Sequence, residues 1–272
     1  MKVIIHILKY VLIGVLCLIF LIPAVWVVIC SFKNNTELYK WPPLFFPTEP
    51  TLSNYQLAFE KGKFGVYFFN STLVTIIATF ITVIINTATG FGLAKYKFRG
   101  RNVLLIGFVS TLMIPLEVIM IPIFTVIKTL GLYNSLWGII IPPAATPTGL
   151  FLMRQYLLSI PDELLQAARI DGASEWYIFR RLILPMAKPA IAVLSIFSFM
   201  WRWNDFLWPL IVIGNPGKYT IQLAISNFVG EFNVDWNSLL GMSVVTMVPV
   251  LIVFLIFQRQ FVQGMITAGM KD

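Results

Sequence analysis

The sequence predicts an all-α membrane protein with about six transmembrane helices. Of its 272 residues, 58% are hydrophobic and only 12% are charged, whereas soluble domains carry about 25% charged residues. The apolar residues are concentrated in stretches close to the roughly 20 residues that a helix needs to cross a bilayer. Helices are the expected form of these spans, because lipid offers no hydrogen-bonding partner to an exposed backbone.

The first apolar stretch covers residues 10–29 and follows Lys2 and Lys9. It is longer than the apolar core of a signal peptide and no small-residue cleavage motif closes it, so we expect an uncleaved membrane anchor. In the third span, Pro115 and Pro122 predict a broken helix with freed carbonyl groups. No internal repeat is visible, and residues 1–272 are predicted to form a single transmembrane domain. The five later spans are expected at residues 69–94, 103–127, 136–155, 190–213 and 238–257.

The basic residues predict that both termini are cytoplasmic. With the N-terminus inside, the inner segments hold more lysine and arginine than the outer ones, as the positive-inside rule requires. The inner set is Lys2, Lys9, Lys95, Lys97, Arg99, Arg101, Arg154, Arg169, Arg180, Arg181, Lys188, Arg259 and Lys271, and the outer set is Lys33, Lys40, Lys61, Lys63, Lys128 and Lys218. Residues 31–68 then form the longest extracytoplasmic loop, and residues 157–189 face the cytoplasm. Orientation accounts for the net charge of +8, which therefore gives no indication of nucleic-acid binding.

The cytoplasmic loop contains the one long polar interruption late in the chain, SIPDELLQAARIDGASEWYIFRRLILPMAKP. It predicts a helix, a turn and a second helix. Pro161 suits the start of the first helix, and Gly172 ends it, because glycine adopts the left-handed conformation that other residues resist. Ser174 is a cap for the second helix. Such a hairpin either lies on lipid headgroups or docks a soluble partner.

Within this hairpin, QAARIDGA followed by FRRLILP resembles the coupling loop of binding-protein-dependent ATP-binding-cassette (ABC) importers. Gln166 stands where that family usually has glutamate, so an amide hydrogen bond would replace an ion pair at this position. The resemblance implies contact with an ATPase through Gln166, Ala167, Ala168, Arg169, Asp171, Gly172 and Ala173, with Phe179 and Pro185 completing the motif.

Other segments resemble, in the same order, the carbohydrate-uptake permeases related to the maltose-type importer. Asn54 and Tyr55 fit the signature of the outer loop, and the tail QRQFVQGMITAGMKD fits the family's C-terminus, with Gly264 to Met270 as a second candidate ATPase contact. The resemblance implies the type I ABC importer permease fold in the cell membrane of a prokaryote. It also implies a second homologous permease chain, two copies of an ATPase that carry ATP and Mg²⁺, and an extracytoplasmic solute-binding protein. No cofactor is expected on this chain itself.

No catalytic group of residues is visible. His6 is the single histidine, so a Ser-His-Asp triad or a histidine metal cluster would lack members. The segment Pro216 to Tyr219 imitates only the end of a phosphate-binding loop and lacks its first glycine. The chain is therefore predicted not to be an enzyme and to have no metal site.

Polar residues within the spans are the candidates for a solute path, because such residues are costly in lipid and face a bundle interior or a water-filled cavity. They are Glu117, Asn86, Arg202, Trp203, Asn204 and Asp205. Most have an alternative role. The tryptophans suit an interfacial belt, Arg202 and Asp205 suit an ion pair, Glu117 suits a bond to a neighbouring helix near the outer boundary, and Asn86, with Thr82 and Thr75, suits helix–helix hydrogen bonding. The leading function is an ATP-driven importer of a sugar or oligosaccharide. The alternatives are an ATP-independent channel or secondary carrier, and an ABC permease for a non-sugar solute.

Overall fold

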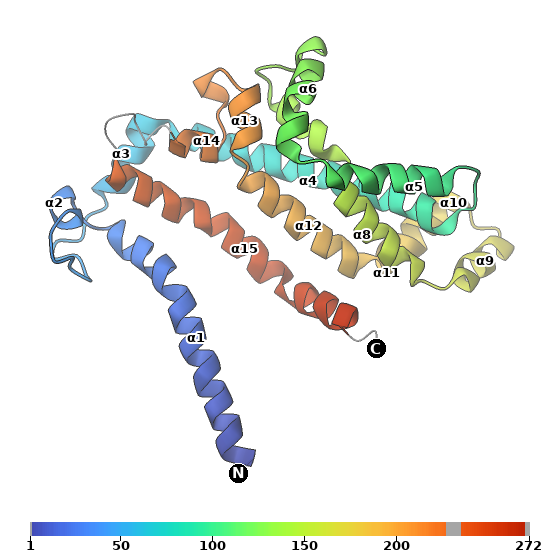
Figure 1. Cartoon of the computed structure of the whole chain (residues 1–272), viewed down its shortest axis with the longest axis horizontal. Coiled ribbons are helices and arrows are strands. Elements are labelled where there is room, and N and C mark those ends of the chain that lie inside the picture. Colours follow the sequence, from blue (N-terminus) through green and yellow to red (C-terminus); the bar gives the residue numbers. More distant parts are fainter. Residues whose placement is uncertain (1, 227–234, 270–272) are drawn as a thin grey trace. The chain divides into compact units, whose positions relative to one another are not determined.

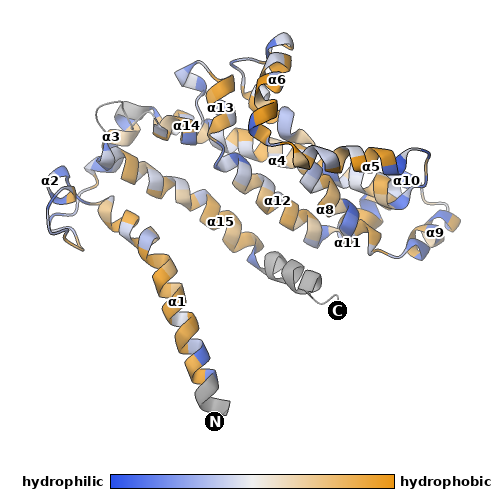
Figure 2. Ribbon diagram, in the orientation of Figure 1, coloured by the Kyte–Doolittle hydropathy of each residue, from blue (hydrophilic) through white to orange (hydrophobic). Residues whose placement is uncertain are grey.

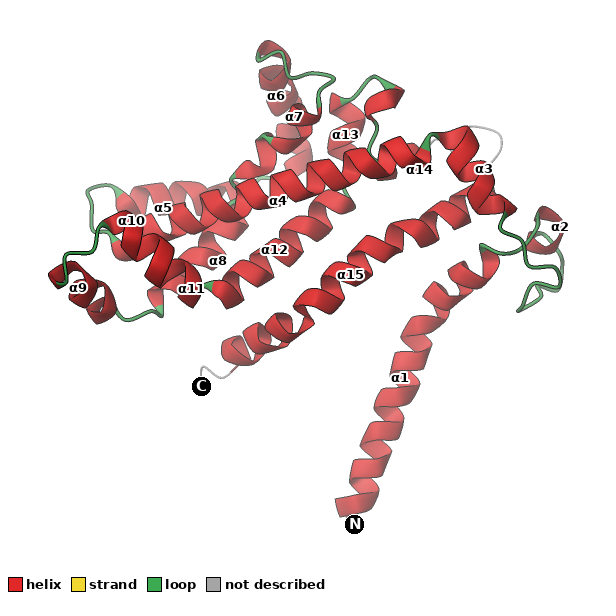
Figure 3. Cartoon of the chain, turned by 180° about the vertical axis from the view of Figure 1, so that it is seen from behind, coloured by secondary structure: helices red, strands yellow, loops and turns green. Residues whose placement is uncertain are grey.

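The structure is a computed structural model that describes the backbone of residues 2–226 and 235–269, with side chains described for 6–60, 63–226 and 235–258. Every regular element in these ranges is a helix (Figures 1 and 3). The contacts divide the chain into two units, so the prediction of one transmembrane domain stays a prediction. Unit 1 is Met1–Gly65 with Ala224–Pro249, and unit 2 is Val66–Leu223 with Val250–Asp272. The side chains of the predicted C-terminal contact, Gly264 to Met270, lie outside the described part.

Within the described residues, three helices are long and apolar enough to cross a bilayer: α1 (Lys2–Cys30), α4 (Phe64–Lys95) and α15 (Trp236–Gly269). Figure 2 shows α1 as apolar along most of its length. Three bent pairs pass the same test together, so the described chain has up to six spans if each pair counts as one. The all-α fold and the number of spans are thus as the sequence predicts.

The first bent pair joins α5 (Arg101–Ser110) and the short helix η1 (Thr111–Met113) to α6 (Leu116–Thr129), with a bend of 110°. The predicted break is at Pro115, whose ψ of 137° is extended. Pro122 lies inside α6 and does not interrupt it.

The break in the second bent pair was not predicted, whereas the third bent pair falls where the sequence separates the hairpin (157–189) from the span 190–213. In the second, α7 (Leu136–Ile140) and η2 (Pro142–Ala144) meet α8 (Pro147–Leu158) at 41°. Pro142, Pro143 and Pro147 lack the N–H groups that would continue one helix. In the third, α10 (Glu175–Tyr177), the π-helix η3 (Ile178–Ile183) and α11 (Leu184–Met186) meet α12 (Lys188–Trp203) at 76°. The predicted span 190–213 is shorter than expected, because α12 ends at Trp203 and α13 (Leu207–Val212) is a separate helix.

Unit 1 is organised around the Asn-Tyr pair of the outer-loop signature. Asn54, in α3 (Ser53–Gly62), donates from Nδ2 to the carbonyls of Ser31 (2.7 Å) and Lys33 (2.8 Å) directly after α1. Asn237 of α15 donates to the same Lys33 carbonyl (3.1 Å) and to Asn54 Oδ1 (2.9 Å). The hydroxyl of Tyr55 lies 2.6 Å from Ser31 Oγ. One buried amide therefore satisfies two carbonyls of the segment that directly follows α1.

Unit 2 contains two hydrophobic cores along α4. The core at the Lys95 end joins α4 to α8, α9 (Asp162–Ile170), η3 and α12 through Phe91, Met153, Leu157, Leu165, Ile178, Ile183 and Leu194. The core at the other end joins α4 to α6, α7, α13 and α14 (Ile221–Ser226) through Val74, Ala78, Met120, Ile139, Ile140, Trp208, Val212 and Leu223. Along the same helix, α4 also carries buried polar residues, among them Thr75, Thr82 and Asn86.

Candidate functional site

The predicted helix–turn–helix is present in residues 162–186. Asp162 and Glu163 lie in the first turn of α9, where the helix dipole favours carboxylates. Gly172 has a φ of +81°, and its N–H donates to the carbonyl of Arg169 (3.0 Å), while the N–H of Ala173 donates to Ala168 (3.0 Å). This pattern closes the helix C-terminus. Ser174 Oγ accepts from the N–H of Tyr177 at 3.2 Å, so the predicted second cap is confirmed.

One face of this hairpin packs on the membrane helices and the other is exposed. Leu165, Ile178 and Ile183 are at most 2% exposed and belong to the core at the Lys95 end of α4. Of the predicted contact residues, Ala168 and Ala173 are half-buried, and Gln166, Ala167, Arg169, Asp171 and Gly172 are exposed. Around them lie four large exposed apolar side chains: Leu164 (42%), Ile170 (85%), Trp176 (68%) and Tyr177 (58%). We call the exposed residues of 164–177 the hairpin face.

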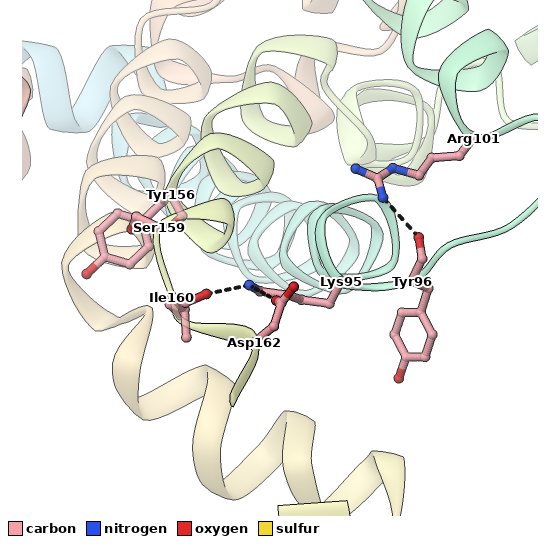
Figure 4. Close-up of polar contacts among 7 residues, drawn as sticks. All are labelled: Lys95, Tyr96, Arg101, Tyr156, Ser159, Ile160 and Asp162. Carbon is pink, nitrogen blue, oxygen red and sulfur yellow. Dashed lines mark hydrogen bonds and ion pairs between the residues drawn. The ribbon is translucent and has the colours of Figure 1, made fainter. Parts of the chain in front are cut away.

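Lys95, the last residue of α4, fastens the start of the hairpin. Its Nζ donates to the carbonyl of Ile160 (2.5 Å) and to Asp162 Oδ1 (2.6 Å), as Figure 4 shows. Next to it, Arg101 Nη1 donates to the carbonyl of Tyr96 (3.2 Å) and so secures the turn between α4 and α5 (Figure 4). The hydrogen bond and charge of Lys95 lower the pKa of the Asp162 carboxyl, so the ion pair is complete at neutral pH and is lost only as the pH falls through that lowered pKa.

Tyr96 fastens the far side of the hairpin through Glu175. The Tyr96 hydroxyl donates to Glu175 Oε2, and Arg169 donates to Glu175 from Nε (2.7 Å) and Nη2 (3.2 Å) across the Gly172 turn. Burial and the hydrogen bond to Glu175 raise the pKa of Tyr96 to about 12, while Arg169 and Tyr96 lower the pKa of Glu175. The phenol is therefore protonated and the carboxylate ionised throughout the neutral range. Two neighbouring residues, at the end of α4, thus hold the start of each of the two hairpin helices.

Lys95→Met is expected to weaken the transmission of movement from the hairpin to α4. The lysine side chain is 3% exposed and its two partners lie in the hairpin, so methionine removes both bonds and retains most of the volume. We expect co-purification of the ATPase predicted from the sequence to persist and the predicted ATP-driven uptake to fall about tenfold, the effect of roughly 1.4 kcal/mol. Lys97→Met is the control, because Lys97 is exposed two residues along. Equal uptake by the two variants would contradict this role.

A second polar cluster surrounds the break between α7 and α8, and we call its side chains, Thr82, Asn86, Ser198 and Arg202, the α4 seam. Arg202 of α12 donates from Nη2 to Thr82 Oγ1 and to the carbonyl of Pro143 (both 2.6 Å), and from Nη1 to Ser198 Oγ (2.8 Å). Asn86 donates to the carbonyl of Ala144 (3.4 Å) and accepts from the N–H of Thr146 (3.2 Å). These side chains satisfy backbone groups that the prolines leave unpaired. A cavity of about 240 Å³ adjoins the seam, lined in part by Thr82, Thr146, Ser198, Trp201 and Arg202.

The remaining predicted path residues are dispersed. Trp203 is 1% exposed and stacks on Phe199, with ring centroids 5.8 Å apart, and Asn204 is exposed beyond the end of α12. Asp205 Oδ1 accepts from the N–H of Trp208 (3.3 Å) at the start of α13. Among the described residues no ion pair within 4.0 Å joins Arg202 to Asp205, so their direct pairing stays a prediction.

Glu117 lies exposed in the first turn of α6, directly after the break at Pro115. The positive end of the α6 dipole favours a carboxylate there. The structure thus gathers Asn86 and Arg202 into one cluster and does not bring Glu117, Asn204 or Asp205 into it. Solute contact by the six path residues predicted from the sequence, Trp203 included, stays a prediction.

Sequence reasoning missed the side chains that hold the hairpin, which are Lys95, Tyr96, Asp162 and Glu175, and it missed the helix break that the α4 seam closes. The available signal was the pair of prolines in IIPPAATPTG, which marks a broken helix whose carbonyls need donors. No comparable local signal links Lys95 to Asp162, because 67 residues separate them.

Comparison with known proteins shows which family this chain resembles. Residues 86–267 match the family described as binding-protein-dependent transport system inner membrane component. The arabinooligosaccharides transport system permease protein AraQ of Halalkalibacterium halodurans is 34% identical, over 92% of this chain and 90% of that protein. The multiple sugar-binding transport system permease protein MsmG of Streptococcus mutans is also 34% identical, over 97% of this chain and 96% of its own length.

A solved bacterial ABC transporter involved in the import of the acidic polysaccharide alginate has a chain that superposes with a TM-score of 0.84 at 25% identity. The match covers 94% of this chain and 96% of that one. The predicted type I permease fold is therefore confirmed, and the chain is a multi-pass protein of a prokaryotic cell membrane. The family match and the similarity over nearly the whole length lead to one conclusion: this chain belongs to the inner-membrane components of binding-protein-dependent transport systems.

Proposed function

We propose that this chain is a permease subunit of an ATP-driven importer of a sugar or oligosaccharide. Relatives named for transport of arabinooligosaccharides and for multiple-sugar transport support the solute class. The hairpin face supports coupling to an ATPase. Its exposed apolar residues are held on the membrane helices by a buried core and by Lys95 and Tyr96. The expected partners are a second permease chain, two ATPase copies that bind ATP and Mg²⁺, and an extracytoplasmic solute-binding protein.

The proposed mechanism transmits movement through packed elements. When the ATPase binds the hairpin face and closes around ATP, we expect the hairpin to move as a rigid body. Its buried residues belong to the same hydrophobic core as α4, and Lys95 and Tyr96 bond it to the end of that helix. The core at the Lys95 end also includes α8 and α12, which carry the break and the arginine of the α4 seam. Binding energy at the ATPase therefore biases a pore with two arrangements.

Reconstituted transport tests the proposal. Liposomes that contain this chain, the partner permease and the ATPase, supplied with the solute-binding protein outside, are loaded with ATP and offered a panel of labelled neutral oligosaccharides. We expect uptake with ATP and none with a non-hydrolysable analogue. Uptake at the same rate without the ATPase would favour the channel or carrier alternative. ATP-dependent uptake of a non-sugar solute, with none of the sugars taken up, would overturn the proposed solute class but not the proposed coupling to ATP hydrolysis.

A further inference from the structure

Unit 1 contains a cavity of about 420 Å³ in the predicted extracytoplasmic part of the chain. The cavity lies among the end of α1, the short helix α2 (Asn35–Leu38) and the start of α15. Its lining combines aromatic rings with two side chains of opposite charge and a thiol: Trp26, Tyr39, Trp236, Lys33, Glu37 and Cys30. None of these residues belongs to the hairpin face or to the α4 seam.

Lys33 is 2% exposed and no carboxylate lies within ion-pair distance of it among the described residues. Its Nζ donates to the carbonyl of Leu44 (2.6 Å) and stands 4.4 Å from the centre of the Trp26 ring. An ammonium group has three donors and is costly to bury without partners. Lys33 therefore retains hydrogen-bond donors for a further acceptor.

Glu37 is 7% exposed and divides its two oxygens unequally. Oε1 accepts from the N–H of Thr48 (2.8 Å), from the Thr48 hydroxyl and from the N–H of Glu49 (3.3 Å). Oε2 is buried and has no hydrogen-bond partner. A buried carboxylate oxygen without a donor is strongly unfavourable, so this side chain, which lines the cavity, is matched to a ligand that supplies a hydroxyl or N–H.

We propose that this cavity binds one ring of a neutral, polyhydroxylated sugar on the outer side of the permease. Hydroxyl groups both donate and accept, so neighbouring hydroxyls suit Glu37 Oε2 and Lys33 Nζ together. Aromatic faces such as those of Trp26 and Trp236 provide the apolar surface on which a sugar ring lies. The two charges cancel, so the cavity offers no net attraction to a phosphate or carboxylate, and Glu37 Oε2 needs a donor that these anions lack; both points favour a neutral ligand over lipid headgroups and acidic sugars.

The site is additional to the proposed transport path and requires neither the ATPase nor the hairpin. Cys30 lines the cavity and is the buried thiol of the two free cysteines, Cys17 being exposed. In a Cys17→Ser background, Cys30 therefore reports on the cavity alone. The full chain is placed in lipid nanodiscs free of sugar-headed detergents, and the modification of Cys30 by a small methanethiosulfonate is followed by mass spectrometry.

We expect raffinose, maltotriose or arabinotriose to protect Cys30, with modification slowed about tenfold at ten times the Kd. Glu37→Gln should raise the concentration needed for protection by about tenfold, because it removes a charge-assisted acceptor. Tyr39→Ala should also weaken protection, whereas Trp41→Ala should not, because Trp41 is 87% exposed and outside the lining.

Three results would overturn the proposal. One is a thiol that the reagent does not reach in the absence of sugar, since the cavity would then be closed to ligands. Another is modification that none of the neutral sugars slows. The third is protection by glycine betaine or by digalacturonate in preference to the neutral sugars. Each result is independent of whether the reconstituted transporter imports sugar.

Discussion

Gly172→Pro is expected to lower the amount of ATPase that co-purifies with the chain by at least about tenfold, equivalent to roughly 1.4 kcal/mol or more. Gly172 has a φ of +81°, and proline is fixed near about −65°. The substitution also removes the N–H that donates to Arg169. The turn must therefore open, which separates Arg169 from Glu175 and changes the relative placement of the two helices that make up the hairpin face. The measurement is an affinity purification from membranes, with the ATPase quantified per permease.

Gly131→Pro is a closely matched control. Gly131 has a φ of +70°, its N–H donates to Lys128 (3.1 Å), and Leu132 donates to Ile127 (3.0 Å). It thus ends α6 with the same hydrogen-bond pattern with which Gly172 ends α9. A side chain at either glycine would meet open space, so the strain comes from the backbone alone. Equal loss of ATPase from both variants would indicate general unfolding and contradict the assignment of the hairpin face.

The fold was predictable because its signals are local. Hydropathy and helix length locate α1, α4 and α15, Pro115 locates one break, and Gly172 and Ser174 locate the turn and the second cap. Each of these features follows from the allowed conformations or hydrogen bonds of one short stretch of chain. The same local signals predict the hairpin.

The contacts that complete the sites were not predictable in the same way. Lys95 and Asp162 are ordinary helix-end residues in the sequence, and their ion pair depends on how α4 packs beside α9. Arg202 was expected to face solute or Asp205, but its two terminal nitrogens donate to Thr82, Pro143 and Ser198, while its Nε has no partner in the described part of the chain. The break at Pro143 creates that demand, and only the tertiary structure shows which side chain meets it.

Arg202→Met is expected to destabilise the permease more than it alters any solute contact. The substitution keeps an unbranched apolar stem and removes the donors to Thr82 and Pro143. Each lost hydrogen bond from the charged guanidinium costs about 1.5–3 kcal/mol, so we expect the apparent Tm of the purified chain to fall by roughly 5–10 °C. Because Thr82 also donates to the carbonyl of Pro143 (3.2 Å), the effects of Thr82→Val and Arg202→Met should not be additive.

Arg154→Met is the control for loss of an arginine from a span. Arg154 of α8 is half-buried, and its hydrogen bond from Nε to the carbonyl of Leu93 is 3.3 Å long. Its removal should shift the Tm by less than half as much as removal of Arg202. If Arg202→Met instead left the Tm unchanged and abolished uptake, the arginine would belong to the solute path, as the sequence alone suggested. A lowered Tm with uptake retained per folded molecule would establish that it closes the break between α7 and α8.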